Sequence, residues 1–284
     1  FAPWHTTLGY LWLSSSNYSQ AAACLEQALK VSPDYGPAIL GLAQIAIKQG
    51  ESGKAQTHIQ RAAELFPRAY QPHLVWGQLY LSQGDYDKAL AQFRQALDKR
   101  KGDWHSQLGI AAVHLRQEEC ESAARQFQDL MARLPRFADG QSGMGFARLC
   151  SKEINKALDY FRKALELEPY NSTAQTGLAR AYASQQRWDE TITAYVQALR
   201  LSEANADVHA SLGDAFALQG LVKEAEAEYR LAVQLDRNSV PAHIGLGTVL
   251  FLREKYDEAR MHMELALTRS EKAHEARRIL GTIF

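Results

Sequence analysis

The sequence predicts an all-α fold in which one helix pair is repeated eight times in tandem. First, a step of 34 residues from Ala89 meets alanine at seven of eight positions, as does the same step from Ala96. Second, the same step from Gly77 meets only glycine or alanine. Third, the apolar residues within one period are spaced three and four apart, which indicates helices and not strands. No insertion or deletion interrupts the period.

The period divides the chain into eight repeats and a partial ninth, which we expect to form a single array over residues 1–284. Their bounds are 2–35, 36–69, 70–103, 104–137, 138–171, 172–205, 206–239, 240–273 and the terminal helix 274–284. In each repeat we expect a first helix, a short turn and a second helix. In the third repeat the break falls at Gln83-Gly84-Asp85, between a face with Trp76, Leu79 and Tyr80 and a face with Ala89, Phe93 and Ala96.

Recurrent residue types explain how these helices pack and end. Glycine or alanine at positions 8, 20 and 27 allows close approach, while bulkier residues at positions 7 and 24 fill the space between helices. Proline at position 32 should stop the second helix of four repeats, at Pro33, Pro67, Pro135 and Pro169. The other four have Lys101, Glu203, Arg237 and Glu271 there, so those junctions must turn by other means.

This pattern resembles the tetratricopeptide repeat family over essentially the whole chain. The resemblance rests on the 34-residue helix–turn–helix period, the small residues at positions 8, 20 and 27, and the proline at position 32. It implies a right-handed α-solenoid, a superhelix in which the first helices line a concave groove and the second helices face outward. Each repeat would then pack only on its neighbours.

Composition and charge exclude several kinds of protein. Lysine plus arginine equals aspartate plus glutamate at 32 each, so nothing in the net charge favours binding of nucleic acid or an anionic membrane. No apolar run approaches the ~18 residues that cross a bilayer. The first residue is Phe1 and nothing near it resembles a signal peptide, so we expect an excised or processed segment.

The three cysteines, Cys24, Cys120 and Cys150, are odd in number and far apart in the sequence. We therefore expect neither a disulfide framework nor a metal-ligand cluster, and a reducing compartment. The corresponding localisation is cytoplasmic, with the periplasm as the alternative if the chain comes from an export system.

No catalytic motif stands out from the repeat. The chain has no phosphate-binding glycine-rich loop, HExxH, GxSxG or CxxC, so we predict no enzyme and no cofactor. His73, His209 and His243 share position 4 of their repeats, but neighbours 34 residues apart lie too far apart to share a metal ion. We expect these histidines to have a structural role and the chain to have no metal site.

The resemblance implies that positions 2, 5, 9, 12 and 13 of each first helix line the groove. In repeats 1 to 5 these positions carry an apolar stripe made of Tyr10, Leu13, Leu40, Ile47, Leu74, Leu81, Leu108, Leu115, Phe146 and Leu149, interleaved with Gln44, Gln78 and Arg116. One interpretation is packing between adjacent first helices; the other is a groove for an extended or helical partner segment. Repeats 6 and 7 are more polar there, with Arg180 and Asp214.

Two subtypes of the family are disfavoured. The carboxylate clamp needs lysine and asparagine at positions 5 and 9, and no repeat has that pair. Subfamilies with an asparagine ladder carry it at position 6, where this chain has five glycines, at 41, 109, 143, 177 and 245. We expect these glycines to leave that wall of the groove without side chains.

Three functional hypotheses follow. The first is a non-enzymatic scaffold that binds a protein or peptide partner in the groove, without nucleic acid or direct membrane insertion. The alternative is a recruiting or regulatory segment of a larger protein: an enzyme, a signalling protein or an export machine for polysaccharide or pili. The third is self-association through residues 274–284, because no second helix follows to cover Ile279, Leu280 and Ile283.

Overall fold

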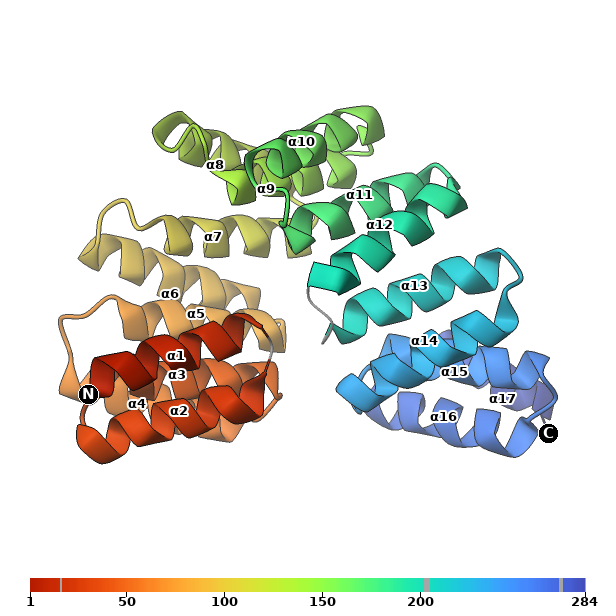
Figure 1. Ribbon diagram of the computed structural model, residues 1–284, viewed down its shortest axis with the longest axis horizontal. Helices are drawn as coiled ribbons and strands as arrows, with labels where there is room; N and C mark the ends of the chain where they lie inside the picture. Colours follow the sequence, from red (N-terminus) through yellow and green to blue (C-terminus); the bar gives the residue numbers. More distant parts are fainter. Residues whose placement is uncertain (16, 202–204, 271–272, 284) are drawn as a thin grey trace. The chain divides into compact units, whose positions relative to one another are not determined.

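The computed structural model describes residues 1–15, 17–201, 205–270 and 273–283, and its regular elements there are all α-helices. They form two compact bodies, Phe1–Glu153 and Ile154–Phe284 (Figure 1). The N-terminal body contains α1 (Ala2–Ser14), α2 (Tyr18–Val31), α3 (Gly36–Lys48), α4 (Ser52–Leu65), α5 (Gln71–Gln83), α6 (Tyr86–Lys99), α7 (Trp104–Arg116), α8 (Cys120–Arg133) and α9 (Ala138–Cys150). The C-terminal body contains α10 (Ile154–Leu167), α11 (Ser172–Ser184), α12 (Trp188–Leu201), α13 (Ala206–Leu218), α14 (Val222–Leu235), α15 (Val240–Leu252), α16 (Tyr256–Arg269) and α17 (His274–Ile283).

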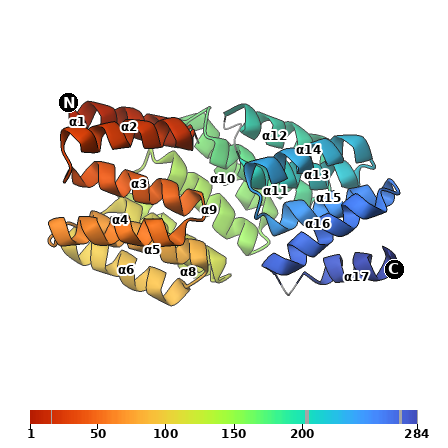
Figure 2. The same ribbon diagram turned by 90° about the horizontal axis from the view of Figure 1, so that it is seen from below.

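Consecutive helices pack against one another within each body, and most first helices of successive repeats also touch. In the N-terminal body α3 contacts α1 and α5, and α7 contacts α5 and α9. Figure 2 shows α1, α3 and α5 following one another in this order. In the C-terminal body α15 likewise contacts α13 and α17. The predicted all-α solenoid of tandem helix pairs is therefore confirmed.

Glycines at positions 6 and 8 hold the large side chain of position 24 between two helices. A Cβ on Gly77 would lie 2.5 Å from the ring of Phe93, and a Cβ on Gly109 of the next repeat would also lie 2.5 Å from it. Tyr229 lies in the same way between Gly213 and Gly245. The position 6 glycines therefore face the preceding second helix. Our expectation that they leave a groove wall bare was wrong, because helix packing fills the space beside them.

The turn between the two helices of a repeat needs one residue in the left-handed region at position 15. Glycine occupies it at Gly50, Gly84 and Gly220, with φ between 73° and 77°. Four repeats place a residue with a side chain there, at Glu118, Lys152, Gln186 and Glu254, with φ between 58° and 61°. Such residues adopt this conformation at a cost of roughly 1 kcal/mol.

Three of the four junctions without proline place a polar N-cap on the following helix, and so does the junction after Pro169, where Asn171 Oδ1 accepts from the Ala174 amide. Asp103 Oδ2 accepts from the Ser106 amide at 2.9 Å, and Asn205 and Ser239 cap α13 and α15 in the same way. After Pro33, Pro67 and Pro135 the N-cap residues make no side-chain hydrogen bond to the helix. A capping side chain stabilises its helix by about 1 kcal/mol, so it is one way in which a helix begins after a junction without proline.

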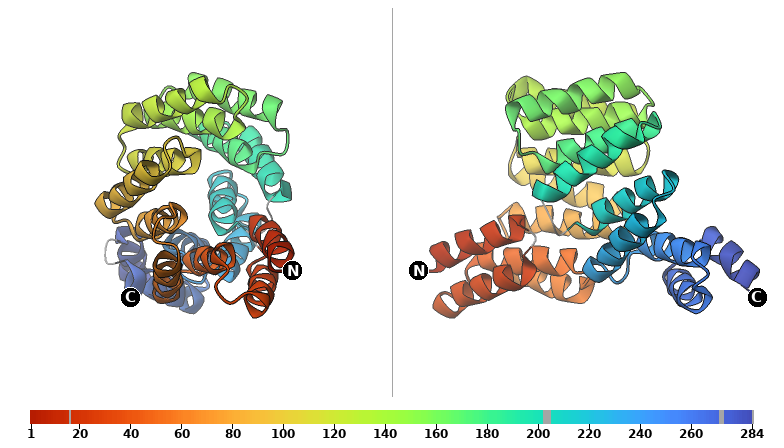
Figure 3. Two further views of the ribbon diagram at one scale, coloured as in Figure 1. Left: turned by 90° about the vertical axis from the view of Figure 1, so that its left-hand side faces the viewer. Right: turned by 45° about the vertical axis from the view of Figure 1, so that its right-hand side comes forward.

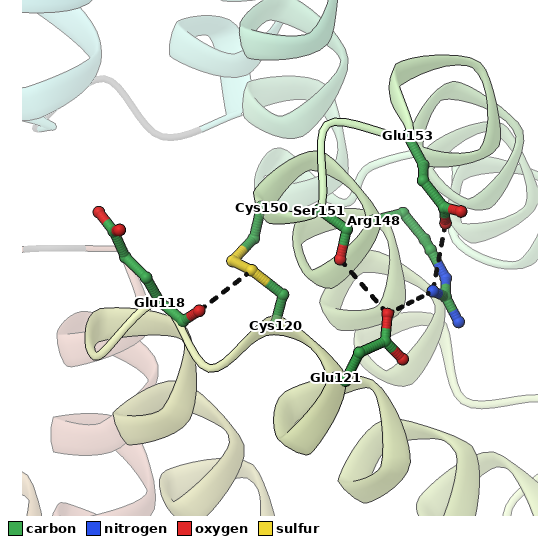
Figure 4. The surroundings of a disulfide bond; sticks show 7 residues. All are labelled: Glu118, Cys120, Glu121, Arg148, Cys150, Ser151 and Glu153. Atoms are coloured by element: carbon green, nitrogen blue, oxygen red, sulfur yellow. Dashed lines mark hydrogen bonds and ion pairs between the residues drawn. A yellow bond between two sulfur atoms is a disulfide. The ribbon is translucent and has the colours of Figure 1, made fainter.

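A disulfide joins Cys120, the first residue of α8, to Cys150, the last residue of α9 (Figure 4). Their Cα atoms are 5.6 Å apart, and Cys24 is free. The expectation that these cysteines stay unpaired was wrong. Position 17 of one repeat lies beside position 13 of the next, a spacing of 30 residues that the sequence does not display as proximity. A hydrogen bond between Gln219 and Asp189 also joins two residues that are 30 apart in the sequence.

The region around the disulfide also contains an ion-pair cluster. Arg148 Nη1 lies 3.1 Å from a carboxylate oxygen of Glu121 and 3.2 Å from one of Glu153 (Figure 4). Arg148 is on α9 and Glu121 on α8, so these charges link the same two helices as the disulfide does.

The last helix, α17, ends the C-terminal body and packs on α16 (Figure 3). Ile279 is only 2% exposed, in a cluster with Met263 and Ala266, and Leu280 packs against the same cluster. The expectation that Ile279 is uncovered was therefore wrong, because one face of α17 closes the core of the preceding repeat. The side chain of Ile283 lies outside the described residues, and self-association stays a prediction. Among the described residues no helix has the length and apolar character to cross a membrane.

Candidate partner-binding face

The first helices of the N-terminal body form a face with two hollows. The larger, of about 680 Å³, is lined by Leu13, Ser14, Tyr18, Gln44, Ile47, Lys48, Gln78, Leu81, Ser82 and Arg116. The smaller, of about 370 Å³, is lined by Tyr10, Gly36, Pro37, Leu40, Gln44, Phe66, Ala69, Gln71, Pro72, Leu74, Val75, Gln78 and His105. Residues from α1, α3, α5 and α7 line both, so this face of the body is concave.

The larger hollow, here called the basic hollow, contains two cations and no carboxylate among its lining residues. Lys48 is the last residue of α3 and Arg116 the last of α7. Neither forms an ion pair with any carboxylate in the described parts of the chain. Leu13, Ile47 and Leu81 supply its apolar wall. The basic hollow is therefore suited to an acidic group beside an aliphatic one.

The smaller hollow, here called the apolar hollow, has mainly hydrocarbon walls. Leu40 and Leu74 are 7% and 8% exposed, so their side chains form its floor and contribute little free surface. Tyr10 donates a hydrogen bond through its hydroxyl to the Pro37 carbonyl oxygen at 3.0 Å. Burial and then the neighbouring Tyr35 raise the pKa of Tyr10 to about 12, so the ring stays neutral. This hollow is suited to an uncharged apolar side chain.

Gln44 and Gln78 stand between the two hollows and line both of them. The side-chain Nε2 of Gln44 donates to Oε1 of Gln78 at 3.4 Å, across one repeat length. The bond is long, and each carboxamide retains donor and acceptor capacity. Such groups can hydrogen-bond the backbone of a segment that crosses from one hollow to the other.

The structure brings together part of the predicted stripe. Tyr10, Leu13, Leu40, Gln44, Ile47, Leu74, Gln78, Leu81 and Arg116 line the hollows, whereas Leu108, Leu115, Phe146 and Leu149 are half-buried and line neither. The sequence reasoning omitted Lys48, at position 13, and His105, at position 2, although the resemblance implied both positions. Phe66, at the C-terminal end of α4, had no signal in the pattern of first helices.

In the C-terminal body the two predicted polar residues are not equivalent. Arg180, on α11, is exposed. Asp214, on α13, accepts a hydrogen bond of 2.5 Å from the hydroxyl of Tyr229. Loss of hydration raises the pKa of Asp214, although the Tyr229 bond acts in the opposite direction. Asp214 is therefore bonded within its own repeat, although it is exposed as Arg180 is.

The histidines at position 4 bond to the second helix of their own repeat. His73 Nδ1 lies 2.9 Å from Gln92 Oε1, and His209 Nδ1 lies 2.6 Å from Glu228 Oε2. His243 bonds to His262 in the same place. All three pairs are 19 residues apart, which supports the structural role that we predicted for position 4. The described residues contain no group of three or more histidine, cysteine or acidic side chains able to hold a metal ion.

Models of known protein families match most of the chain. Models described as tetratricopeptide repeat match residues 13–72 and 151–193, 74–141, 206–239 and 245–278, and one described as TPR repeat matches 179–220. No curated protein sequence matches the chain significantly.

Two solved structures share the fold at low sequence identity. A chain from the crystal structure of the APC/C hetero-tetramer Cut9-Hcn1 is 16% identical, with a TM-score of 0.72 over 97% of this chain. This chain spans only 54% of that one. A thermophilic TPR protein of Thermus thermophilus is 22% identical, with a TM-score of 0.59, over 64% of this chain and 100% of its own length.

Proposed function

Because the chain belongs to the tetratricopeptide repeat family, we propose that its N-terminal body binds a segment of a partner protein across the two hollows. The repeat fold supports a protein-interaction scaffold in general, and binding without catalysis is typical of it. The observation that carries the specific proposal is the Gln44–Gln78 pair, which stands between an apolar hollow and a basic one.

The proposed partner segment is extended and carries an apolar side chain followed or preceded by an acidic one. The apolar side chain occupies the hollow floored by Leu40 and Leu74, where burial of one aliphatic side chain contributes roughly 1.5–3 kcal/mol. The acidic group lies near Lys48 and Arg116, which have no carboxylate partner in the described chain. The carboxamides of Gln44 and Gln78 bond the backbone between them.

Selection from a library of random peptides displayed on phage tests this proposal without knowledge of the natural partner. We expect enrichment of peptides that combine aliphatic or aromatic residues with aspartate or glutamate. Their affinity should fall at least about tenfold in the double variant Gln44→Ala with Gln78→Ala, as one or two hydrogen bonds are lost. A matched control is Gln56→Ala with Gln95→Ala, two exposed glutamines on α4 and α6.

The proposal fails if no peptide is enriched, or if the enriched peptides bind the Gln44/Gln78 variant as well as the control. The charge reversals Lys48→Glu and Arg116→Glu then test the acidic group separately, and they should weaken acidic peptides only. Both residues are exposed, so these variants keep the fold. The harsher pair Leu74→Glu and Leu108→Glu distinguishes packing from recognition only where circular dichroism shows an intact fold.

We also propose that the protein works in an oxidising compartment, in place of the cytoplasm that the cysteine count suggested. The Cys120–Cys150 disulfide supports this, because disulfides persist in the periplasm and in extracellular spaces. Alkylation of the protein from its native source, followed by mass spectrometry, should modify Cys24 alone. Modification of all three cysteines would contradict the proposal.

A further inference from the structure

A third hollow, in the C-terminal body, lies against α14, α15 and α16. Its volume is about 530 Å³, and its lining residues are Arg230, Val233, Gln234, Arg237, His243, Leu246, His262, Leu265 and Arg269. Three arginines and two histidines stand there with no carboxylate among the lining residues. The second helices α14 and α16 contribute most of the lining, so this hollow is not on the first-helix face discussed above.

The two histidines have a defined pattern of hydrogen atoms. His243 Nε2 is 3.1 Å from the carbonyl oxygen of Arg237, which can only accept, so this nitrogen carries hydrogen. In neutral His243 the Nδ1 atom is therefore an acceptor. His262 Nδ1 lies 2.9 Å from it and must be the donor. Neutral His262 is left with a bare lone pair on Nε2.

This Nε2 atom has no hydrogen-bond partner in the described chain, and it keeps some contact with solvent. The residue is 8% exposed, and its only hydrogen bond is the one to His243. Since His262 lines the hollow, its unpaired nitrogen is available to whatever occupies that space.

The arginines determine what can bind. Arg230 is paired with Glu226 and Glu258, each at 2.9 Å. Arg237 and Arg269 have no carboxylate partner among the described residues. Two unpaired guanidinium groups favour an anion, and arginine binds the oxygens of carboxylate or phosphate through parallel hydrogen bonds.

An anion would be repelled by a lone pair on His262 but attracted by a hydrogen on the same nitrogen. Protonation at Nε2 leaves the Nδ1 bond to His243 intact and requires no rotation of either ring. Burial, then His243 and Arg230, lower the pKa of His262, while Glu258 opposes this shift. The free site is thus neutral at His262 near neutral pH, and an anion would reverse the balance.

We propose that this hollow is an oxyanion site in which Arg237 and Arg269 hold the anion and His262 takes up a proton at Nε2 as the anion binds. The proton comes from bulk water, and no covalent bond changes. Val233, Leu246 and Leu265 leave room for an apolar portion beside the charged group. The preceding repeat has Glu228 at the position that His262 occupies in this one. There a carboxylate of the chain itself lies beside the equivalent histidine, His209.

The anion is either free phosphate or a carboxylate on a partner segment, and two probes distinguish these sources. Inorganic phosphate and a capped Leu-Glu-Leu peptide are each titrated by calorimetry at about pH 5.5 and pH 7.5, in buffers that contain no other oxyanion. We expect at least about tenfold tighter binding at the lower pH and uptake of close to one proton, from linkage. Whichever probe binds identifies the source, and binding of neither overturns the proposal.

Substitutions at the site and an NMR determination of which histidine nitrogens carry hydrogen complete the test. Arg237→Gln with Arg269→Gln should weaken binding about tenfold or more, whereas Arg136→Gln with Arg200→Gln, two exposed arginines elsewhere, should not. His262→Gln should abolish the pH dependence. Long-range nitrogen NMR of the unmodified protein at pH 7.5 should show hydrogen on Nδ1 of His262 and on Nε2 of His243. The opposite assignment, or pH-independent binding, would refute the site.

Discussion

The ring of Phe93 occupies the place that a side chain on Gly109 would need: a Cβ built there lies 2.5 Å from the ring atoms Cε1 and Cζ. Phe93 lies on the second helix of the third repeat and Gly109 on the first helix of the fourth, so this contact joins two repeats. At the same two positions of the preceding repeats, Ile59 and Val75 pack in one cluster. The isoleucine is smaller than Phe93, and it leaves room for a valine in place of the glycine.

Gly109→Ala should destabilise the N-terminal body by roughly 1–3 kcal/mol, because an added methyl overpacks a filled site. Chemical denaturation measures the change. Adding Phe93→Leu to the same variant should recover part of the loss, since the aliphatic Ile59 packs with the larger Val75 at the equivalent positions. If Gly109→Ala is neutral, the contact does not limit packing.

Reduction of the Cys120–Cys150 disulfide should lower the stability of α8 and α9. The closed loop of 30 residues gives an upper bound of roughly 3–4 kcal/mol from chain entropy. Hydrogen exchange with and without reductant should show faster exchange in these two helices. The double variant Cys120→Ser with Cys150→Ser is the control, and it should not respond to reductant. Equal exchange in both states of the unmodified protein would count against a stabilising role.

The left-handed position of the turns can be improved or damaged by single substitutions. Gln186→Gly should stabilise the C-terminal body by up to about 1 kcal/mol, because glycine adopts φ of 58° without strain. Gly84→Ala should destabilise the N-terminal body by about 1 kcal/mol for the converse reason. Crowding does not affect the result, since a Cβ at Gly84 would meet nothing within 4 Å and Gln186 is exposed. Thermal unfolding of both variants and of the unmodified protein measures the two effects. Midpoints equal to that of the unmodified protein would exclude strain at this position.

Stability should fall as the pH drops below 6.5, the ordinary pKa of histidine. Burial lowers the pKa of His262 and of His58 in the folded chain, so the unfolded chain binds more protons once the pH falls below that value. The stabilisation is complete above pH 6.5 and declines as the pH decreases toward the folded pKa values. Urea unfolding in buffers without oxyanions should show this, and the double variant His58→Gln with His262→Gln should flatten the slope. An unchanged slope would mean that other groups cause it.

The repeat explains why so much of the fold could be predicted. Helix pairs that pack only on their neighbours impose the same local requirement every 34 residues, so Ala89 and Ala96 recur and register is visible in the sequence alone. The proline-free junctions were predicted to need another device without its being identified, because an N-cap such as Asp103 becomes evident only when the helix start is known.

The sequence by itself determined the class of fold and the helix pairs, because these depend on spacing along the chain. The tertiary structure decided which residues meet across repeats. It paired Cys120 with Cys150, separated Leu13 and Gln78 from Leu108 and Leu115, and placed His262 in one hollow with Arg237 and Arg269. These relations depend on how one helix lies against the next, and a periodic pattern that every repeat shares contains no information about contacts particular to one of them.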